Sequence, residues 1–138
     1  MTETQKSKLI QEALLAREKS YSPYSGFSVG AALITKDGEI FTGANIESSS
    51  YTPTVCAERV AVFTAVHAGK QDFSAIAIVG GKSKSEVCDF CPPCGVCRQV
   101  LAEFASGDME VILYDGQKAE TYTLAELLPK GFNKDNLK

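Results

Sequence analysis

The sequence of 138 residues contains no long apolar run, and no segment approaches the ~20 consecutive apolar residues that a membrane-spanning helix needs. Its first twenty residues, MTETQKSKLIQEALLAREKS, are too charged and too periodic for a signal peptide. These absences predict no membrane partner and a cytoplasmic location. In that compartment, the five cysteines are expected to serve as metal ligands or free thiols rather than as disulfides.

A cluster of lysines and arginines is also missing. The net charge is −3 and the isoelectric point is near 5.2. Proteins that bind nucleic acids usually present a basic face, because contacts to phosphates supply most of their affinity. We therefore expect no nucleic-acid partner, and a small molecule as the ligand.

The chain has no internal repeat, no low-complexity stretch and no linker, which predicts one domain over residues 1–138. Its composition, 44% hydrophobic and 22% charged, is ordinary for a globular protein. A chain of this length buries roughly two-thirds of the surface that its unfolded form exposes. It can therefore build a sizeable core.

Apolar periodicity predicts helices and strands in the order α-β-β-α-β-α-β-α, a helix-covered sheet of mixed direction. A hairpin signal, KDG at 36–38, joins the first two strands, and a Thr-x-x-Glu pattern at Thr123 opens the last helix. The opening helix carries one apolar stripe: Leu9, Ile10, Ala13 and Leu14. The helix within 52–70 carries Val60, Val62, Phe63 and Val66 and ends near Gly69. The other expected segments are strands 27–35, 39–46, 73–81 and 109–115 and helices 97–106 and 123–128.

The stretch CDFCPPCGVC places four cysteines three residues apart, at Cys88, Cys91, Cys94 and Cys97. The remaining cysteine of the chain is Cys56. Two arrangements are open. All four clustered thiols could hold an iron–sulfur cluster or a structural zinc. Alternatively, two of them could join Cys56 around a catalytic zinc.

The two prolines of this stretch favour the second pair of cysteines. Pro92 and Pro93 promote an extended spacer, which would separate the Cα atoms of Cys91 and Cys94 by about 9 Å. Sulfurs on a tetrahedral zinc lie only about 3.8 Å apart. Cys94 and Cys97 instead fall in the first turn of a helix that Pro93 can initiate, where residues three apart share a face.

Cys56 begins another helix in the segment VCAER. The free N–H groups and positive dipole at a helix N-terminus stabilise thiolates, so two such ends could hold three thiolates around one zinc. Three protein ligands leave a fourth position open for water, as in catalytic zinc sites. Glu58 lies two residues after Cys56, where a carboxylate can transfer protons. Zinc deaminases carry this arrangement: His or Cys, x, Glu, then Pro-Cys-x-x-Cys.

The chain resembles the small cytidine deaminases that act on free nucleosides. The resemblance rests on NIESSSYTPTVCAERVAVFTAV and PPCGVCRQVLAEF, with YSPYSGFSVGAAL and ELLPKGF in the expected order. It implies a three-layer α/β fold with a mixed sheet of about five strands. It also implies hydrolytic deamination of cytidine and 2′-deoxycytidine with release of ammonia, as in pyrimidine salvage. The acidic balance and the free-nucleoside segments argue against a nucleic-acid editor.

The same resemblance assigns roles to individual residues at the metal. Cys56, Cys94 and Cys97 match the ligands of one Zn²⁺ per chain, and Glu58 matches the proton shuttle. Arg59 matches an arginine that hydrogen-bonds the ligand sulfurs and reduces their charge.

Further matches concern the substrate. Asn45 and Glu47 match the residues that hold the ribose hydroxyls, and Phe27 matches an aromatic residue that packs against the base. The backbone of Ala57 would contact the pyrimidine. Phe132 matches a residue that reaches a neighbouring subunit's pocket, which implies a homotetramer with shared active sites.

The chain departs from the family pattern in two places. Ser48 follows NIE where the family usually has Asn, and the loop before the second motif looks longer and carries Cys88 and Cys91. We expect these two thiols to be free rather than to form a second metal site. His67, the only histidine, lies near a helix end and is expected to have no metal role.

Overall fold

The computed structural model describes residues 1–86 and 89–138. Within these residues, five strands form one sheet in the order β2-β1-β3-β4-β5, and only the β3–β4 pair among them is parallel. The strands are β1 (Phe27–Thr35), β2 (Ile40–Ala44), β3 (Phe73–Lys82), β4 (Glu110–Tyr114) and β5 (Ala119–Thr123). The helices are α1 (Glu3–Arg17), α2 (Ala57–His67), α3 (Gly95–Phe104) and α4 (Leu124–Leu127), followed by the 3₁₀ helix η1 (Lys134–Leu137).

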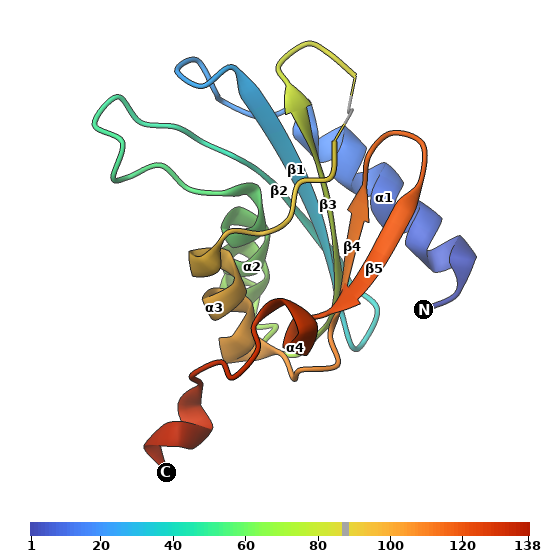
Figure 1. Cartoon of the computed structure of the whole chain (residues 1–138), viewed down its shortest axis with the longest axis vertical. Helices are drawn as coiled ribbons and strands as arrows, with labels where there is room; N and C mark the ends of the chain where they lie inside the picture. Colours follow the sequence, from blue (N-terminus) through green and yellow to red (C-terminus); the bar gives the residue numbers. More distant parts are fainter. Residues whose placement is uncertain (87–88) are drawn as a thin grey trace.

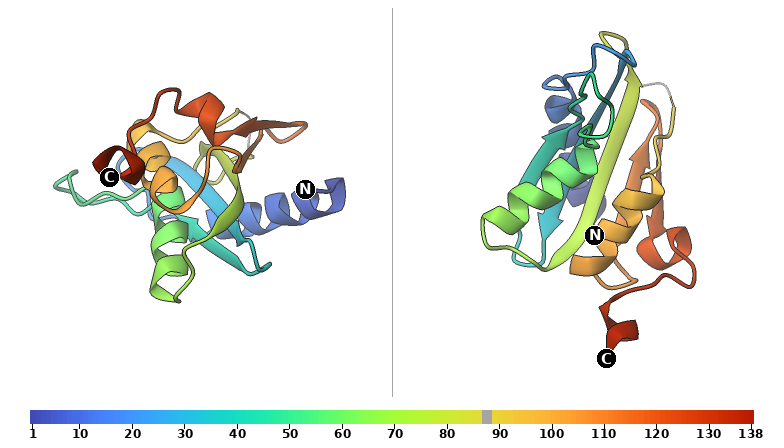
Figure 2. Two further views of the ribbon diagram at one scale, coloured as in Figure 1. Left: turned by 90° about the horizontal axis from the view of Figure 1, so that it is seen from below. Right: turned by 90° about the vertical axis from the view of Figure 1, so that its left-hand side faces the viewer.

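The sheet lies between two helical layers, with α1 on one face and α2 and α3 on the other (Figures 1 and 2). Two buried clusters fill the spaces between the layers because alternate residues of a strand point to opposite faces. Ala32, Ala75 and Ala77 face Leu9 and other residues of α1. Leu33, Ile76 and Ile78 face α2 and α3. The expected three-layer α/β fold with a mixed sheet is confirmed.

The order of elements read from periodicity omits one strand. β5 has the sequence AETYT and none of its residues is fully buried, so it carries too little apolar signal to mark a strand. It lies at the edge of the sheet, paired only with β4. The five strands implied by the family resemblance are therefore present. The capping box at Thr123 is confirmed at the start of α4.

The apolar residues noted in the sequence of α2 differ in their burial. Val62 is buried, but Phe63 is 50% exposed. The buried face of the helix instead consists mainly of alanines: Ala57, Ala61 and Ala65. Small side chains let the helix lie close to the sheet, and this leaves the larger Phe63 on the outer surface.

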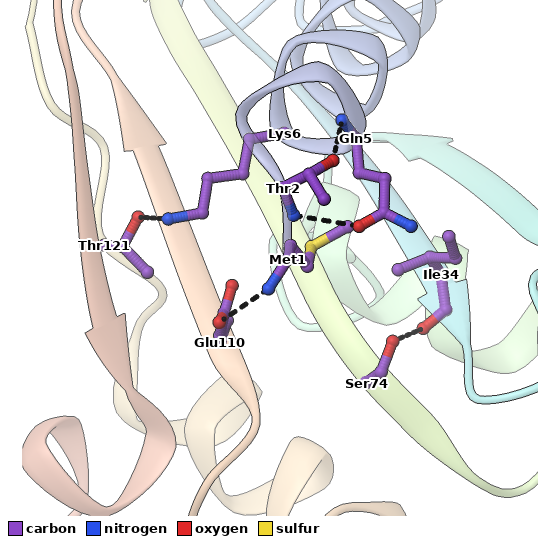
Figure 3. A network of polar contacts seen from close by, with 8 residues as sticks. All are labelled: Met1, Thr2, Gln5, Lys6, Ile34, Ser74, Glu110 and Thr121. Carbon is purple, nitrogen blue, oxygen red and sulfur yellow. Dashed lines mark hydrogen bonds and ion pairs between the residues drawn. The ribbon is translucent and has the colours of Figure 1, made fainter.

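Contacts at the start of α1 fasten this helix to the far strands of the sheet (Figure 3). Thr2 and Gln5 form a capping box, which satisfies free N–H groups of the first turn. The amine of Met1 pairs with Glu110 of β4 at 3.2 Å, and Lys6 Nζ donates to Thr121 of β5 at 3.2 Å. The helix is thereby fixed at one end across β4 and β5, and its other end leads into the loop that precedes β1.

Gly43 of β2 sets the position of α2. A Cβ atom at this residue would lie only 2.5 Å from the carbonyl oxygen of Ala57 and 2.5 Å from the backbone nitrogen of Ala61. The strand therefore touches the backbone of the first helical turns directly, which only glycine permits. This close approach fixes the N-terminus of α2, where Cys56 and Glu58 lie.

None of the helices formed by residues 1–86 and 89–138 has the length and apolar character needed to cross a bilayer.

Candidate active site

The N-terminal ends of α2 and α3 lie side by side and carry the cysteines (Figure 1). Cys56 is the N-cap of α2 and Cys94 is the N-cap of α3, each with an extended backbone. Neither side chain makes a capping hydrogen bond. Cys97 follows as the third residue of α3 and is buried. Both Cys94 and Cys97 were expected in the first turn of a helix initiated by Pro93. In the structure α3 begins one residue after Cys94, so only Cys97 lies in its first turn.

The sulfur atoms of Cys56, Cys94 and Cys97 form one compact group, within 4.8 Å of one another. The Sγ–Sγ distance is 3.9 Å between Cys56 and Cys94 and 3.4 Å between Cys94 and Cys97. Sulfurs bound to a tetrahedral zinc lie about 3.8 Å apart, and thiolates are common zinc ligands. The spacing and chemistry of this group fit Zn²⁺. We call Cys56, Cys94, Cys97 and Glu58 the metal corner.

The thiols of the metal corner differ in their affinity for protons. The pKa of Cys56 is lowered to about 5, first by the hydrogen bond from Cys97 and then by those from Arg59 and Cys94. The pKa of Cys97 is raised, first because it donates to Cys56 and then because it is buried. The neighbours thus already stabilise one thiolate, the form in which cysteine binds metals.

Arg59 supplies positive charge next to this group. Its Nη2 atom lies 3.5 Å from the sulfur of Cys56. Its Nε atom is buried and has no hydrogen-bond partner among the described residues. The guanidinium therefore faces the thiols, and within residues 1–86 and 89–138 it forms no salt bridge with a carboxylate.

Glu58 is the second residue of α2 and is only 5% exposed. Burial is the main reason that its pKa is raised to about 7, and the charge of Cys56 adds to the effect. Its carboxylate also accepts a hydrogen bond from Cys97, so it lies directly beside the thiols. A buried carboxyl group that can gain and lose a proton near neutral pH suits general acid–base chemistry.

A backbone bridge brings the NIE segment to the metal corner. The N–H of Ile46 donates to Val55 at 3.0 Å, and the N–H of Val55 donates back at 2.9 Å. Ile46 separates Asn45 from Glu47, and Val55 immediately precedes Cys56. The regular pairing of β2, predicted to reach residue 46, ends at Ala44, and this bridge continues beyond it.

Asn45 is 8% exposed, and its side-chain amide already uses most of its hydrogen-bonding capacity. Its Oδ1 atom accepts from the Ser20 hydroxyl at 2.5 Å and from the N–H of Val29 at 2.9 Å. Its Nδ2 atom donates to the carbonyl of Phe27 at 2.9 Å. An amide nitrogen has two hydrogens, so one N–H remains for a ligand. In this orientation Asn45 can act on a ligand only as a donor.

Glu47 can act on a ligand as a hydrogen-bond acceptor, whereas Asn45 can act only as a donor. One oxygen accepts from the backbone N–H groups of Tyr24 and Ser25, at 3.0 and 3.1 Å, and the other accepts from the Ser25 hydroxyl. The Ser25 hydroxyl is the largest cause that lowers the pKa of Glu47. The carboxylate thus stays ionised and retains free lone pairs as acceptors. We call Phe27, Asn45, Glu47 and Ser25 the nucleoside corner, after the ligand that the family resemblance predicts for the first three.

Cys91 connects the two corners but does not belong to the thiol group. A Cβ atom added at Gly80 would lie 3.0 Å from the sulfur of Cys91 and 3.1 Å from the ring of Phe27. Burial raises the pKa of Cys91 to about 11, and the charges of Glu58 and Cys56 raise it further. Cys91 is a free, neutral thiol near the carboxyl of Glu58, whereas Cys88 lies outside the described residues.

Comparison with known proteins gives one consistent result. Residues 3–114 match the family described as "Cytidine and deoxycytidylate deaminase zinc-binding region". The chain is 50% identical over 132 residues to the cytidine deaminase of Sporosarcina psychrophila, covering 94% of this chain and 93% of that protein. The cytidine deaminase of Halalkalibacterium halodurans is 47% identical over 130 residues, with coverage of 94% and 95%. The crystal structure of cytidine deaminase from Burkholderia pseudomallei superposes with a TM-score of 0.84 at 44% identity, covering 96% of this chain and all of that one.

The chain belongs to the cytidine deaminase family. The matched region includes the metal corner and the nucleoside corner, and Phe132 lies beyond it. The thiol group of Cys56, Cys94 and Cys97 corresponds to the zinc-binding region of this family. It does not correspond to the alternative, in which an iron–sulfur or structural zinc module would use the four clustered cysteines.

The remaining predicted residues lie apart from the two corners or make no specific polar contact there. Ala57 is the first residue of α2 and is fully buried. Phe132 is 57% exposed, and its carbonyl accepts from Gln99 at 2.6 Å. It lines a hollow of about 600 Å³ beside Phe104, at the end of α3 opposite Cys94. His67 is exposed at the last residue of α2.

Sequence reasoning missed the residues that hold the nucleoside corner in place. Ser20 and Ser25 reach Asn45 and Glu47 only because the loop before β1 folds over the end of β2. The segment YSPYSGFSVGAAL was noted as a family match, but isolated serines have no periodic pattern. No signal in this sequence alone assigns them partners.

Proposed function

We propose that this chain is a zinc-dependent deaminase that converts cytidine and 2′-deoxycytidine into uridine and 2′-deoxyuridine, with release of ammonia. This reaction would serve pyrimidine salvage in the cytoplasm. The observation that carries the proposal is the convergence of three thiols and one buried carboxyl group at two adjacent helix N-termini, in a chain of this family.

Cys56, Cys94 and Cys97 would hold one Zn²⁺ per chain. When bound, the ion supplies a Lewis acid that makes water nucleophilic near neutral pH. Three thiolates and one Zn²⁺ carry a net charge of −1, which weakens such an acid. The guanidinium of Arg59, 3.5 Å from the sulfur of Cys56, would offset part of this charge.

Glu58 would move the protons of the reaction. Its carboxylate takes a proton from the water whose oxygen bonds to C4 of the pyrimidine, and passes it to N3. The hydroxyl on C4 then loses its proton, which the same carboxyl group passes to the exocyclic amine as the C4–N bond breaks, so that ammonia leaves and the C4 carbonyl forms. A pKa raised to about 7 lets one carboxyl group serve as base and then as acid.

Asn45 and Glu47 would together bind a ribose hydroxyl. A hydroxyl group accepts one hydrogen bond and donates another, so it complements the free N–H of Asn45 and the free lone pairs of Glu47. The ring of Phe27 would pack against the base, and the backbone of Ala57 would contact the pyrimidine. This arrangement favours a free nucleoside over nucleic acid.

We further propose a homotetramer in which subunits share active sites. Phe63, Val96 and Phe132 are each at least half exposed, which leaves their apolar surface available to another subunit. Phe63 and Val96 line a shallow apolar groove between α2 and α3. A neighbouring copy would cover these side chains, and Phe132 of one subunit would reach the active-site pocket of the neighbouring subunit. No membrane partner is proposed.

The experiment that tests this function is a loss-of-absorbance assay on cytidine, combined with metal analysis of the same sample. We expect turnover of cytidine and 2′-deoxycytidine, close to one zinc per chain, and no visible colour. A brown protein containing iron, or a zinc protein without turnover, would contradict the proposal.

A further inference from the structure

Ser25 occupies a central place among the residues of the nucleoside corner. Its hydroxyl donates to one carboxylate oxygen of Glu47, and its backbone N–H donates to the other oxygen at 3.1 Å. The same hydroxyl oxygen accepts the backbone N–H of Phe27 at 3.0 Å. One serine therefore contacts the carboxylate of Glu47 and the backbone of Phe27, two residues that are assigned to the nucleoside.

The loop conformation that permits these contacts depends on Gly26. This residue has φ of +66°, in the left-handed region that glycine adopts without strain. Its N–H donates to the carbonyl of Ser22 at 3.1 Å, which closes a tight turn. The turn aims the N–H groups of Tyr24 and Ser25 at the same oxygen of Glu47.

Asn45 completes the arrangement from the other side. It donates to the carbonyl of Phe27, while Ser25 accepts the N–H of Phe27. The backbone N–H and the backbone carbonyl of Phe27 are thus both hydrogen-bonded. Ser25, which binds the N–H, also holds Glu47, and Asn45, which binds the carbonyl, is itself assigned to the ligand. Glu47, Ser25, Phe27 and Asn45 form one continuous hydrogen-bonded chain.

We propose that Ser25 is a positioning residue for nucleoside binding, whose hydroxyl fixes the carboxylate of Glu47 relative to the backbone of Phe27. The inference rests on the proposed function, because it takes the ribose hydroxyl as the ligand of Glu47. Ser25 does not touch the reacting atoms. It acts on affinity for the sugar and not on the proton transfers at the metal corner.

The test compares Ser25→Ala with the wild type on two substrates, cytidine and 2′,3′-dideoxycytidine, which lacks the 2′- and 3′-hydroxyls of the ribose. The backbone N–H groups of Tyr24 and Ser25 still hold Glu47 when the hydroxyl is removed, so we expect the KM for cytidine to rise only about three- to tenfold. The kcat should change less than about twofold, since the reacting groups are intact. The KM for the dideoxy substrate should stay within about twofold of the wild-type value.

Two further variants separate positioning from general damage. Ser25→Thr keeps the hydroxyl and should restore the wild-type KM for cytidine. Ser106→Ala is the matched control, because the exposed Ser106 also donates its hydroxyl to a carboxylate, that of Asp108 beyond α3. It should lower the melting temperature about as much as Ser25→Ala does and leave both KM values unchanged.

Each outcome decides a different question. A wild type that does not deaminate cytidine would overturn the proposed function, and this inference with it. An active wild type with an unchanged KM in Ser25→Ala would overturn the inference alone. Equal KM increases for both substrates, or failure of Ser25→Thr to restore binding, would also overturn it, because these results indicate a disturbed loop.

Discussion

The metal corner and the nucleoside corner use different means to place polar groups. In the metal corner, three thiols and one carboxyl from two helix N-termini contact one another, and each shifts the pKa of its neighbours. In the nucleoside corner, Asn45 and Glu47 are held by backbone N–H groups and serine hydroxyls. The first corner depends on all its members at once, whereas the second has several supports for each side chain. Substitutions should therefore abolish function in the first and weaken it by degrees in the second.

The largest effect is expected for Cys97→Ala. Its thiol is buried and lies 3.4 Å from Cys94, within the compact group of three sulfurs that fits Zn²⁺. Zinc content and cytidine turnover should both fall to background. The melting temperature should fall as well, because metal binding free energy is partly folding free energy.

Cys94→Ala should behave in the same way as Cys97→Ala in metal analysis and in the turnover assay. Retention of about one zinc per chain by either variant would contradict the assigned ligand set. His67→Ala serves as the control, since His67 is exposed at the far end of α2 and should leave zinc content unchanged.

Glu58→Gln should separate chemistry from metal binding within the same corner. The amide is nearly the same size as the carboxyl, so zinc content and fold should be retained. Turnover should fall by about 10²–10⁴-fold or more, the usual contribution of a positioned proton-transfer group. Steady-state kcat and zinc content measured on one preparation check this, and a near-normal kcat would reject Glu58 as the proton shuttle.

The contrast between the corners also explains how far the sequence could be read. The pairing of Cys94 with Cys97 and the nearby Glu58 follow from short spacings at helix starts, where local geometry decides which atoms meet. Cys56 could be added because it begins a similar helix. The sites of Asn45 and Glu47 came from family resemblance alone, because strand ends and loops meet through the tertiary fold.

The fold could likewise be predicted from the sequence only where local patterns decide the structure. The buried strand β3 was predicted because its apolar run is nearly continuous, and β1 was predicted from a strand-like run next to a hairpin signal. The polar edge strand β5 and the exposure of Phe63 were not predicted, since both depend on what lies next to them in space. Ser25 escaped notice for the same reason, as its partner Glu47 is 22 residues away.

Asn45→Ala should have an intermediate effect and would sharpen the comparison. It removes the donor offered to the ribose, so the KM for cytidine should rise about tenfold or more while kcat falls less. It also leaves the N–H of Val29 and the carbonyl of Phe27 without their side-chain partner. A loss of about 1–3 kcal/mol of unfolding free energy is therefore expected.

Denaturant unfolding and steady-state kinetics measure these two effects of Asn45→Ala separately. Zinc content should remain unchanged, because the side-chain hydrogen bonds of Asn45 go to Ser20, Val29 and Phe27 and it is not a member of the thiol group. Loss of zinc together with nucleoside binding would mean that the two corners are one cooperative unit, and the distinction drawn between them would fail.

The smallest effect is expected for Cys91→Ala, although Cys91 lies between the corners. Its thiol is neutral because burial raises its pKa to about 11, and it is not part of the group formed by Cys56, Cys94 and Cys97. Removing one sulfur beside Gly80 and Phe27 should raise the KM for cytidine less than about threefold and leave kcat nearly unchanged. The double variant with Cys88→Ala should also keep about one zinc per chain. Metal analysis and turnover of both variants, beside Cys56→Ala, decide the matter. If the double variant loses its metal while Cys56→Ala keeps it, the clustered cysteines hold the ion and the metal corner is wrongly assigned.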